Sequence, residues 1–399
     1  MWLPVFTKTK LWQQANRLKP WLIDVRRDFH RYPELGMAEY RTRDKIIQYL
    51  EEMGISYKQG MANTGVVGLI EGDKSGRTVA LRADMDALPI TEQNEVDYKS
   101  TIPGKMHACG HDAHTTILLG AAKVLQAHQD KLTGNVKLIF QPAEETVGGA
   151  KPMIEEGVLH NPPVDAVFGL HMAPEIPVGQ IGVKYGQMNA ASDTIRITIK
   201  GKSGHGAYPH SGTDAIVIAA HVITALQTIV SRNVDPREAA VLSIGTIRGG
   251  TQGNIVADEV RLVGTVRTFD AAVRKQVIQR IEEVVEYTAK GLGGDYTFDI
   301  GDDGYIALVN DDSMVDVVKK SGEVLLGRDN VREIAMPSMG VEDFAYFAQA
   351  APSAFFRLGC RNEVKGIVHG AHTGRFDIDE DSLPIGVALQ VQNVMTVLK

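Results

Sequence analysis

The sequence predicts a two-domain α/β protein, in which a small α+β domain is inserted into a larger α/β domain. Two observations support this prediction. Short apolar runs typical of buried strands alternate with helical segments in the first half of the chain and again near its end. Between them, the order β-α-β-β-α-β is that of a ferredoxin-like domain. We therefore expect a discontinuous larger domain of residues 1–186 and 305–399, and an inserted domain of residues 187–304.

The first half of the chain supplies the opening elements of the larger domain. Residues 11–60 predict two helices, because apolar residues recur at helical spacing up to Phe29 and again from Arg41 to Met53, where Gly54 ends the pattern. The elements expected next are strands at 65–70 and 78–82, a helix at 115–126, and strands at 135–140 and 165–170.

The character of the sequence changes near Gln187. Residues 193–200 alternate strictly between polar and apolar side chains, as in a sheet with one solvated face. The other elements expected in the inserted domain are a helix at 214–230, strands at 240–247 and 260–267, a helix at 271–291 and a strand at 296–300. The α/β pattern then returns with a helix at 313–326, a strand at 354–358 and a last helix from about residue 383.

The composition is that of a globular protein with a large core. Of 399 residues, 44% are apolar and 23% are charged. The net charge of −7 and the scattered basic residues argue against nucleic acid or an anionic membrane as a partner. Only Cys109 and Cys360 are present, which favours a reducing compartment over a disulfide framework. The first ten residues lack a secretion signal and no later segment approaches the ~18 apolar residues of a membrane span, so we expect a cytoplasmic location.

Three apolar strands of the larger domain lead to side chains that can bind a metal ion or transfer a proton. Open α/β sheets place their sites at the carboxyl ends of strands, so these side chains are expected to gather there. They are Asp84 and Asp86 after the strand at 78–82, Glu144 and Glu145 after 135–140, and His171 after 165–170.

The densest group of candidate ligands is the stretch 105–114. Cys109 and His111 are ligand types that suit zinc-like cations, and Gly110 allows the backbone to bend between them. The same pattern also fits a structural histidine cluster beside a buried cysteine. His107 and His114 are expected to support a site rather than to bind metal. Near the C-terminus, spacing alone does not choose between His369 and His372 as a further ligand.

The pair Glu144 and Glu145 suits metal-assisted hydrolysis, because neighbouring side chains in extended backbone diverge. One can bind metal, and the other can take a proton from a water whose pKa the cation lowers towards ~7 and pass it to the leaving nitrogen. The alternative for this pair is a solvated helix start, and for His171 it is a histidine that caps the edge of the core. Their position after apolar strands favours the catalytic interpretation.

Five segments of the chain carry recognisable motifs: Arg82–Pro89, Met106–His114, Gln141–Glu145, Gly169–His171 and Gly370–Thr373. Together they closely resemble the amidohydrolase branch of the M20 metallopeptidase family, and the resemblance spans nearly the whole chain. The branch includes hippurate hydrolases, N-acyl-L-amino-acid amidohydrolases, acetyl-diaminopimelate deacetylases and plant auxin-conjugate hydrolases. The resemblance implies a zinc-peptidase-like catalytic domain with an inserted lid and dimerisation domain.

The resemblance also implies a site for two divalent metal ions. Its ligands would be Cys109, His111, Glu145, His171 and His372. Glu144 would be the general base, and Asp86 the carboxylate that orients a ligand. Asp84 stands where the wider family has a histidine ligand, and a bridging aspartate near Cys109 is missing, so we expect a thiolate in its place. Thiolate favours zinc, with manganese, cobalt and nickel as alternatives.

In the inserted domain, the resemblance concerns substrate binding and assembly. The segment Lys202–Pro209 resembles the family segment whose histidine polarises the scissile carbonyl, often across a dimer interface, so His205 would stabilise the oxyanion from its own chain or a partner's. Asn254 lies in a segment that resembles the one contacting the substrate carboxylate, and Arg267 is a second candidate for that contact. Loop solvation is the alternative for all three. We expect a homodimer or higher homo-oligomer through this domain.

The expected activity is metal-dependent hydrolysis of the amide bond of an N-acyl amino acid, giving a carboxylate and a free amino acid. The alternatives within the family are a dipeptidase or aminopeptidase and an N-acetyl-diaminopimelate deacetylase. A peptidase that binds a free amine needs an acidic partner for it, which we cannot assign. Outside the family, Cys109 could be a nucleophile beside His111, which would leave the glutamates without a role, or the chain could bind metal without catalysis.

Overall fold

The computed structural model describes residues 8–73, 76–301 and 304–399. Residues 1–7, which belong to the segment where no secretion signal is expected, lie outside the described part. The chain divides into a first unit of residues 1–188, 309–336 and 343–399, and a second unit of residues 189–308 and 337–342. The short segment 337–342, which the sequence places in the larger domain, joins the second unit, where Ser338 pairs with Asn189.

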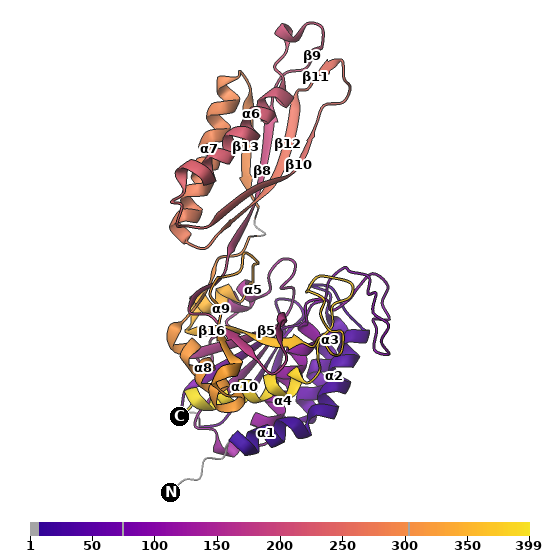
Figure 1. The fold of residues 1–399 in the computed structure, drawn as a ribbon, viewed down its shortest axis with the longest axis vertical. Coiled ribbons are helices and arrows are strands. Elements are labelled where there is room, and N and C mark those ends of the chain that lie inside the picture. The colour runs from indigo at the N-terminus through magenta and orange to yellow at the C-terminus, as the bar shows by residue number, and fades with distance from the viewer. Residues whose placement is uncertain (1–7, 74–75, 302–303) are drawn as a thin grey trace. The chain divides into compact units, whose positions relative to one another are not determined.

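The first unit is built on a mixed eight-stranded sheet in the order β1-β2-β4-β3-β5-β16-β6-β15 (Figure 1). β3 lies between β4 and β5 and runs parallel to both, so the carboxyl ends of β3 and β4 lie side by side, while β5 continues past them to Pro177. The strands are β1 Ser56–Met61, β2 Gly65–Ile70, β3 Thr78–Asp84, β4 Asn135–Gln141, β5 Ala166–Pro177, β6 Ile181–Val183, β15 Val331–Glu333 and β16 Ser353–Arg361. A separate two-stranded sheet pairs β7 (Gly186–Asn189) with β14 (Leu308–Asn310).

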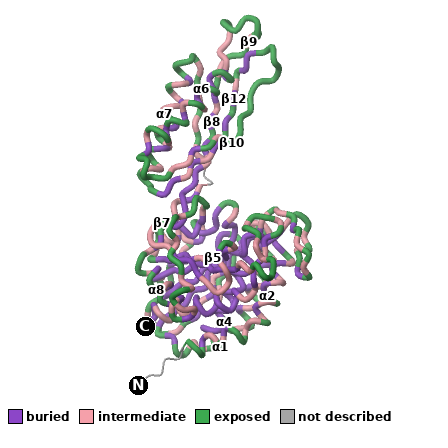
Figure 2. The backbone as a smooth tube through the Cα atoms, viewed as in Figure 1, coloured by how far each residue is buried: buried purple, intermediate pink, exposed green. Residues whose placement is uncertain are grey.

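The helices of the first unit pack on this sheet, and α4 and α10 are almost wholly buried (Figure 2). The expectation of two helices in residues 11–60 is wrong, because a break at Leu18 separates α1 from α2, where Pro20 lies in the first turn of the second helix. The helices are α1 Lys8–Arg17, α2 Lys19–Arg31, α3 Tyr40–Glu52, α4 His111–Gln126, α5 Ala150–Glu155, α8 Asp312–Leu326, α9 Ala345–Ala350 and α10 Ser382–Val397, with short 3-10 turns at Gln129–Lys131 and Arg328–Asn330.

The second unit is a four-stranded antiparallel sheet in the order β10-β12-β8-β13, with two helices on one face. Counted along the chain, this order is the ferredoxin-like arrangement that the sequence predicts. The unit has an apolar core of its own, in which strand residues such as Ile197 pack with helix residues such as Leu226. Its elements are β8 Ala191–Lys200, β9 Gly204–His205, a 3-10 turn at Pro209–Ser211, α6 Ala215–Thr228, a π-helical turn at Ile229–Asn233, β10 Ala240–Gly249, β11 Ile255–Val256, β12 Glu259–Thr268, α7 Ala271–Gly291 and β13 Asp295–Ile300.

One helix of the second unit corrects the expectation that no segment is long and apolar enough to span a membrane. Ala215–Asn233 has 19 residues and meets that test by length and composition. Only 33% of its most apolar 18-residue stretch is buried, and Ile216 and Val217 are exposed. Its buried residues, such as Val222, belong to the core of the unit. A core helix of a soluble protein passes the same test, so this helix alone is weak evidence for a membrane.

Candidate metal centre

The candidate centre lies in the first unit, where β3 and β4 end and beside His171 of β5. The expectation that His171 follows the end of its strand is wrong, because β5 continues to Pro177. Cys109 is the second residue before α4, and His111 is the first residue of that helix. Gly110 between them has a φ of 92°, a left-handed conformation that glycine adopts without strain. A Cβ at this position would also come within 2.8 Å of Met172 Cγ. Glycine is therefore required for the turn that places Cys109 and His111 side by side.

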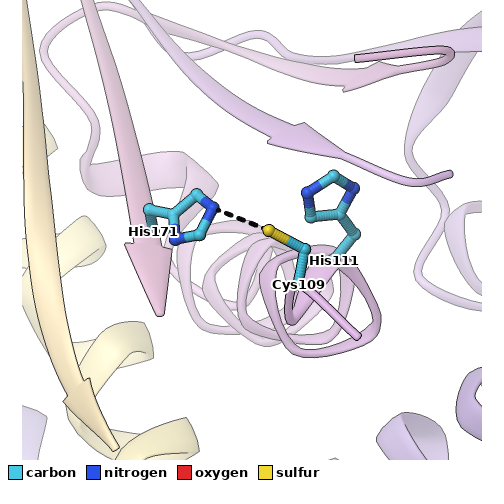
Figure 3. Close-up of side chains that lie close together, drawn as sticks. All are labelled: Cys109, His111 and His171. Atoms are coloured by element: carbon cyan, nitrogen blue, oxygen red, sulfur yellow. Dashed lines mark hydrogen bonds between the residues drawn. The ribbon is translucent and has the colours of Figure 1, made fainter. Parts of the chain in front are cut away.

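The sulfur of Cys109 lies at the centre of the predicted ligands. Cys109 Sγ is 3.3 Å from His171 Nε2 and 3.3 Å from His372 Nε2. Figure 3 shows the His171 ring facing this sulfur, with His111 beside it at the start of α4. His372 Nε2 also lies 3.1 Å from Glu145 Oε1. The structure thus gathers all five predicted ligands around one thiol.

These ligands form two sets that have Cys109 in common. One set is Cys109, His111 and His171, and the other is Cys109, Glu145 and His372; within each set, one potential ligand atom per residue lies within 4.8 Å of the others. A thiolate can bind more than one soft or borderline cation. The arrangement therefore fits two divalent cations that share the sulfur.

An unpaired buried nitrogen provides a further test of this fit. His111 Nε2 has no hydrogen-bond partner in the part of the chain that the structure describes, although His111 is only 1% exposed. The nearest carboxylate oxygens are those of Asp84 at 3.7 Å and Glu145 at 3.8 Å. Leaving a buried polar atom unpaired costs about 1–3 kcal/mol, which a bound cation would offset. The residues present fit a metal at this position.

Asp86 organises both histidine and glutamate candidates. Its Oδ1 lies 3.2 Å from His111 Nδ1 and accepts the backbone N–H of Glu144 at 3.1 Å, while its Oδ2 accepts the N–H of Glu145 at 3.0 Å. Asp86 is 1% exposed. This carboxylate therefore turns His111 Nε2 towards the other ligands and fixes the turn that carries the two glutamates.

Glu144 and Glu145 lie in a turn, so the expected extended backbone is wrong. The turn follows Ala143, whose φ is 56° and whose N–H is held by Glu39. The alternative of a solvated helix start is also wrong, because Glu144 is only 7% exposed. His111, Glu144 and Glu145 form another set of potential ligand atoms within 4.8 Å of one another. Both carboxylates therefore reach the same group of side chains.

Burial and neighbouring charges shift the pKa values of the groups in this cluster. Burial raises the pKa of the Cys109 thiol, and the charge of Glu145 raises it further. Hydrogen bonds with Cys109 and Glu145 raise the pKa of His372 to about 10. Burial lowers the pKa of His111, but the charge of Asp84 and the bond to Asp86 outweigh it and leave that pKa well above its usual value. A divalent cation would have to displace protons from these groups.

The remaining histidines of the predicted motifs have different surroundings. His369 is exposed and belongs to none of the ligand sets found among the described residues. His107 is buried, and neither ring nitrogen has a hydrogen-bond partner in the described structure. His114 Nδ1 lies 2.6 Å from Asp84 Oδ1.

Sequence reasoning missed the buried guanidinium of Arg82. Its Nη1 donates to Asp84 at 2.7 Å and its Nη2 to Asp343 at 2.9 Å, and its Nε donates to Gln141 at 2.8 Å. These bonds tie β3, β4 and the approach to α9 together just below the centre. An arginine within an otherwise apolar strand was the signal, since a buried charge requires partners.

The second unit brings two of its three predicted residues together. β9, which contains His205, pairs with β11, and the carbonyl of Asn254 accepts the N–H of Gly206 at 2.8 Å. Arg267 lies near the other end of β12, which begins at Glu259 next to that region, and donates to its own neighbours Thr265 and Val266. Within this unit, Arg267 is therefore not part of the group around His205.

Comparison with known proteins gives consistent results along most of the chain. Residues 80–396 match the peptidase family M20/M25/M40. The thermostable carboxypeptidase 1 of Saccharolobus solfataricus is 40% identical over 94% of this chain and 95% of its own length. The N-acetyl-L-cysteine deacetylase of Bacillus subtilis is 43% identical over 92% of this chain and 86% of its own. The structure of the B. subtilis YXEP protein, a dinuclear metal binding peptidase from the M20 family, superposes with a TM-score of 0.83 at 34% identity, covering 96% of this chain and 99% of that one.

Proposed function

We propose a substrate class for this chain, which belongs to the peptidase family M20/M25/M40 and is a hydrolase of amide or peptide bonds. It cleaves N-acyl amino acids to a carboxylate and a free amino acid. The observation that carries the proposal is the pair of ligand sets that share Cys109, with the carboxylate of Glu144 beside them. The names of two relatives support the substrate class. A deacetylase of N-acetyl-cysteine and a carboxypeptidase both release an amino acid whose carboxylate is free.

The proposed ligands are Cys109, His111, Glu145, His171 and His372, held in place by Asp86. Two divalent cations bound there would polarise the scissile carbonyl and lower the pKa of a water molecule towards ~7. We expect zinc, because a thiolate is among the ligands, with manganese, cobalt or nickel as alternatives.

The chain's own groups then move the proton. Glu144 takes it from the attacking water and delivers it to the amide nitrogen, so that the amino acid leaves as a neutral amine. Burial of Glu144 limits competing exchange with bulk water. His205 would donate to the oxygen that gains negative charge, and Asn254 or Arg267 would bind the substrate carboxylate.

A homodimer formed through the second unit, and a cytoplasmic location, complete the proposal. Exposed large apolar side chains on this unit, such as Ile216, Val217 and Ile247, support a protein interface there. Both cysteines are free thiols, which suits a reducing compartment.

The proposal is tested by removal and return of metal with a defined set of substrates. Dialysis against a chelator should abolish hydrolysis of N-acetyl, N-benzoyl and indole-acetyl amino acids, and added zinc or manganese should restore it. Activity that survives chelation but not thiol alkylation would instead establish Cys109 as a nucleophile. A peptide with a blocked C-terminus is the control, and its cleavage would contradict a requirement for the free carboxylate.

A further inference from the structure

The pairing of β3 with β5 stops just before the candidate metal centre. The ladder runs from Val79 opposite Ala166 to Arg82 opposite Gly169 and goes no further. β3 remains paired with β4 as far as Asp84, and β5 remains paired with β16 beyond Met172. The sheet therefore divides between β3 and β5 at the level of His171, where main-chain hydrogen bonds no longer hold the two strands together.

The imidazole of His114 spans this division. Its Nδ1 lies 2.6 Å from Asp84 Oδ1 at the end of β3, and its Nε2 accepts the backbone N–H of Met172 on β5 at 2.8 Å. His114 is 2% exposed. Because an amide N–H can only donate, Nε2 carries no proton, and the proton on Nδ1 is donated to Asp84. One tautomer is thus selected by its two partners.

Asp84 is itself held in place. Its other oxygen accepts from Arg82 Nη1 at 2.7 Å, and its carbonyl accepts from the hydroxyl of Thr115 at 3.0 Å. Asp84 is fully buried. The acceptor for His114 is therefore fixed by β3 on one side and by α4 on the other.

The backbone that His114 holds also orients the ligand His171. His171 Nδ1 donates to the carbonyl of Met172 at 2.7 Å, which leaves Nε2 unprotonated and 3.3 Å from Cys109 Sγ. The N–H of residue 172 is thus fixed by His114, and its C=O fixes the ring of His171. The two rings are also in edge contact, with centroids 4.8 Å apart.

We propose that His114 is a positioning residue, which bridges the divided strands and thereby holds His171 in its metal-binding orientation. The inference rests on the proposed function, because it assigns His171 as a ligand. His114 touches neither substrate nor metal in this proposal. It acts through one backbone amide, so the contact with Met172 matters more for metal binding than the contact with Asp84.

Two substitutions separate these contacts. In His114→Gln, the side-chain oxygen can reach the position of Nε2 and accept the N–H of Met172. In His114→Asn, the side-chain NH₂ can replace Nδ1 as the donor to Asp84, but the shorter side chain leaves the Met172 N–H without its acceptor. The readouts are zinc affinity of the full-length protein by chelator competition, the thiolate-to-metal absorption of the cobalt-loaded protein, and melting of the metal-free protein. The exposed His221→Asn is the matched control.

We expect His114→Asn to weaken metal affinity by about 10- to 100-fold and to alter the cobalt spectrum, while His114→Gln stays below the lower end of that range and His221→Asn has no effect. The proposal is overturned if both His114 variants lose affinity equally, or if both lower only the melting temperature of the metal-free protein. Wild-type protein that binds no divalent metal would refute the proposed function itself. Wild-type protein that binds two metals, with His114→Asn unchanged, would refute only the role of His114.

Discussion

Glu144 and Glu145 are adjacent in the chain but have separate tasks in the proposed centre. Glu145 Oε1 lies 3.1 Å from His372 Nε2, so it belongs with the ligands, whereas Glu144 is left to carry the proton. Glu144→Gln should therefore retain both metal ions and lower kcat by about 10²- to 10⁴-fold, the usual contribution of a general base. Metal analysis and steady-state kinetics on the same preparation check this.

Glu145→Gln is the control for that substitution, because it removes a ligand and should reduce metal content as well as turnover. A Glu144→Gln enzyme with near-normal kcat would show that another group takes the proton.

Metal affinity should rise with pH. The bonds with Cys109 and Glu145 raise the pKa of His372 to about 10, and burial raises the pKa of Cys109. Below these pKa values a cation must displace protons to bind, so lowering the pH opposes binding. Zinc competition titrations at pH 6 and pH 8 should give weaker binding at pH 6. Equal affinity at both values would contradict the assignment of these groups as ligands.

The sequence predicts which types of residue form the site better than it predicts which individual residues do so. Cys109 and His111 stand out by their local spacing. His171 was expected after the end of a strand, but it lies within β5, which continues to Pro177. No spacing rule selects His372 over His369, because the choice depends on a φ of 61° at His372 and on its N–H, which donates to Ala108 at 2.8 Å. Contacts of this kind join segments more than 250 residues apart, so they are visible only in the folded chain.

At the scale of elements, α4 is the helix on which the centre depends, since it begins at His111 and is buried along its length. Gly120 lies where α2 and α10 pack against it, and a Cβ there would come within 2.5 Å of Val387 and 2.7 Å of Leu22. Gly120→Ala should therefore destabilise the protein by about 1–3 kcal/mol through overpacking. Urea denaturation followed by circular dichroism measures the change.

Gly291 provides the matched control for that glycine. It is the last residue of α7, and nothing lies within 4 Å of a Cβ placed on it. Gly291→Ala should be neutral or stabilising by up to about 1 kcal/mol, because alanine favours the helix. Equal effects of the two substitutions would show that close packing at Gly120 is not limiting.

Most elements could be predicted because their apolar pattern is strong. The helix at 271–291 and the strand at 65–70 form at the expected residues. β1 was missed because its residues are mostly polar and exposed, in keeping with its place at the edge of the sheet. β6 and β15 were missed because three residues are too few to show a period.

For the whole molecule, the proposal divides the work between two units. The first unit holds the ligands and Glu144, while His205 belongs to the second. If His205 acts across a dimer rather than within its own chain, His205→Ala and Glu144→Gln chains should each be inactive, yet a mixture of the two should regain part of the activity. In a mixed dimer, one centre then has both Glu144 and the partner's histidine.

This complementation is measured by refolding or exchanging subunits of the two variants together. A mixed dimer without activity would place His205 and Glu144 of the same chain in one centre. The sequence predicts that Glu144 and His205 belong to different domains, which is what this test requires. It does not predict that residues 337–342 belong to the second unit, because their place there depends on pairing at Asn189.

The central claim is that the sulfur of Cys109 is a ligand of two metal ions. An anomalous diffraction map of zinc-loaded crystals tests it most directly. The account predicts two peaks per chain, each about 2.3 Å from Cys109 Sγ, one next to His111 and His171 and the other next to Glu145 and His372. A map with no peak at Cys109, or with zinc bound only away from these five side chains, would contradict it.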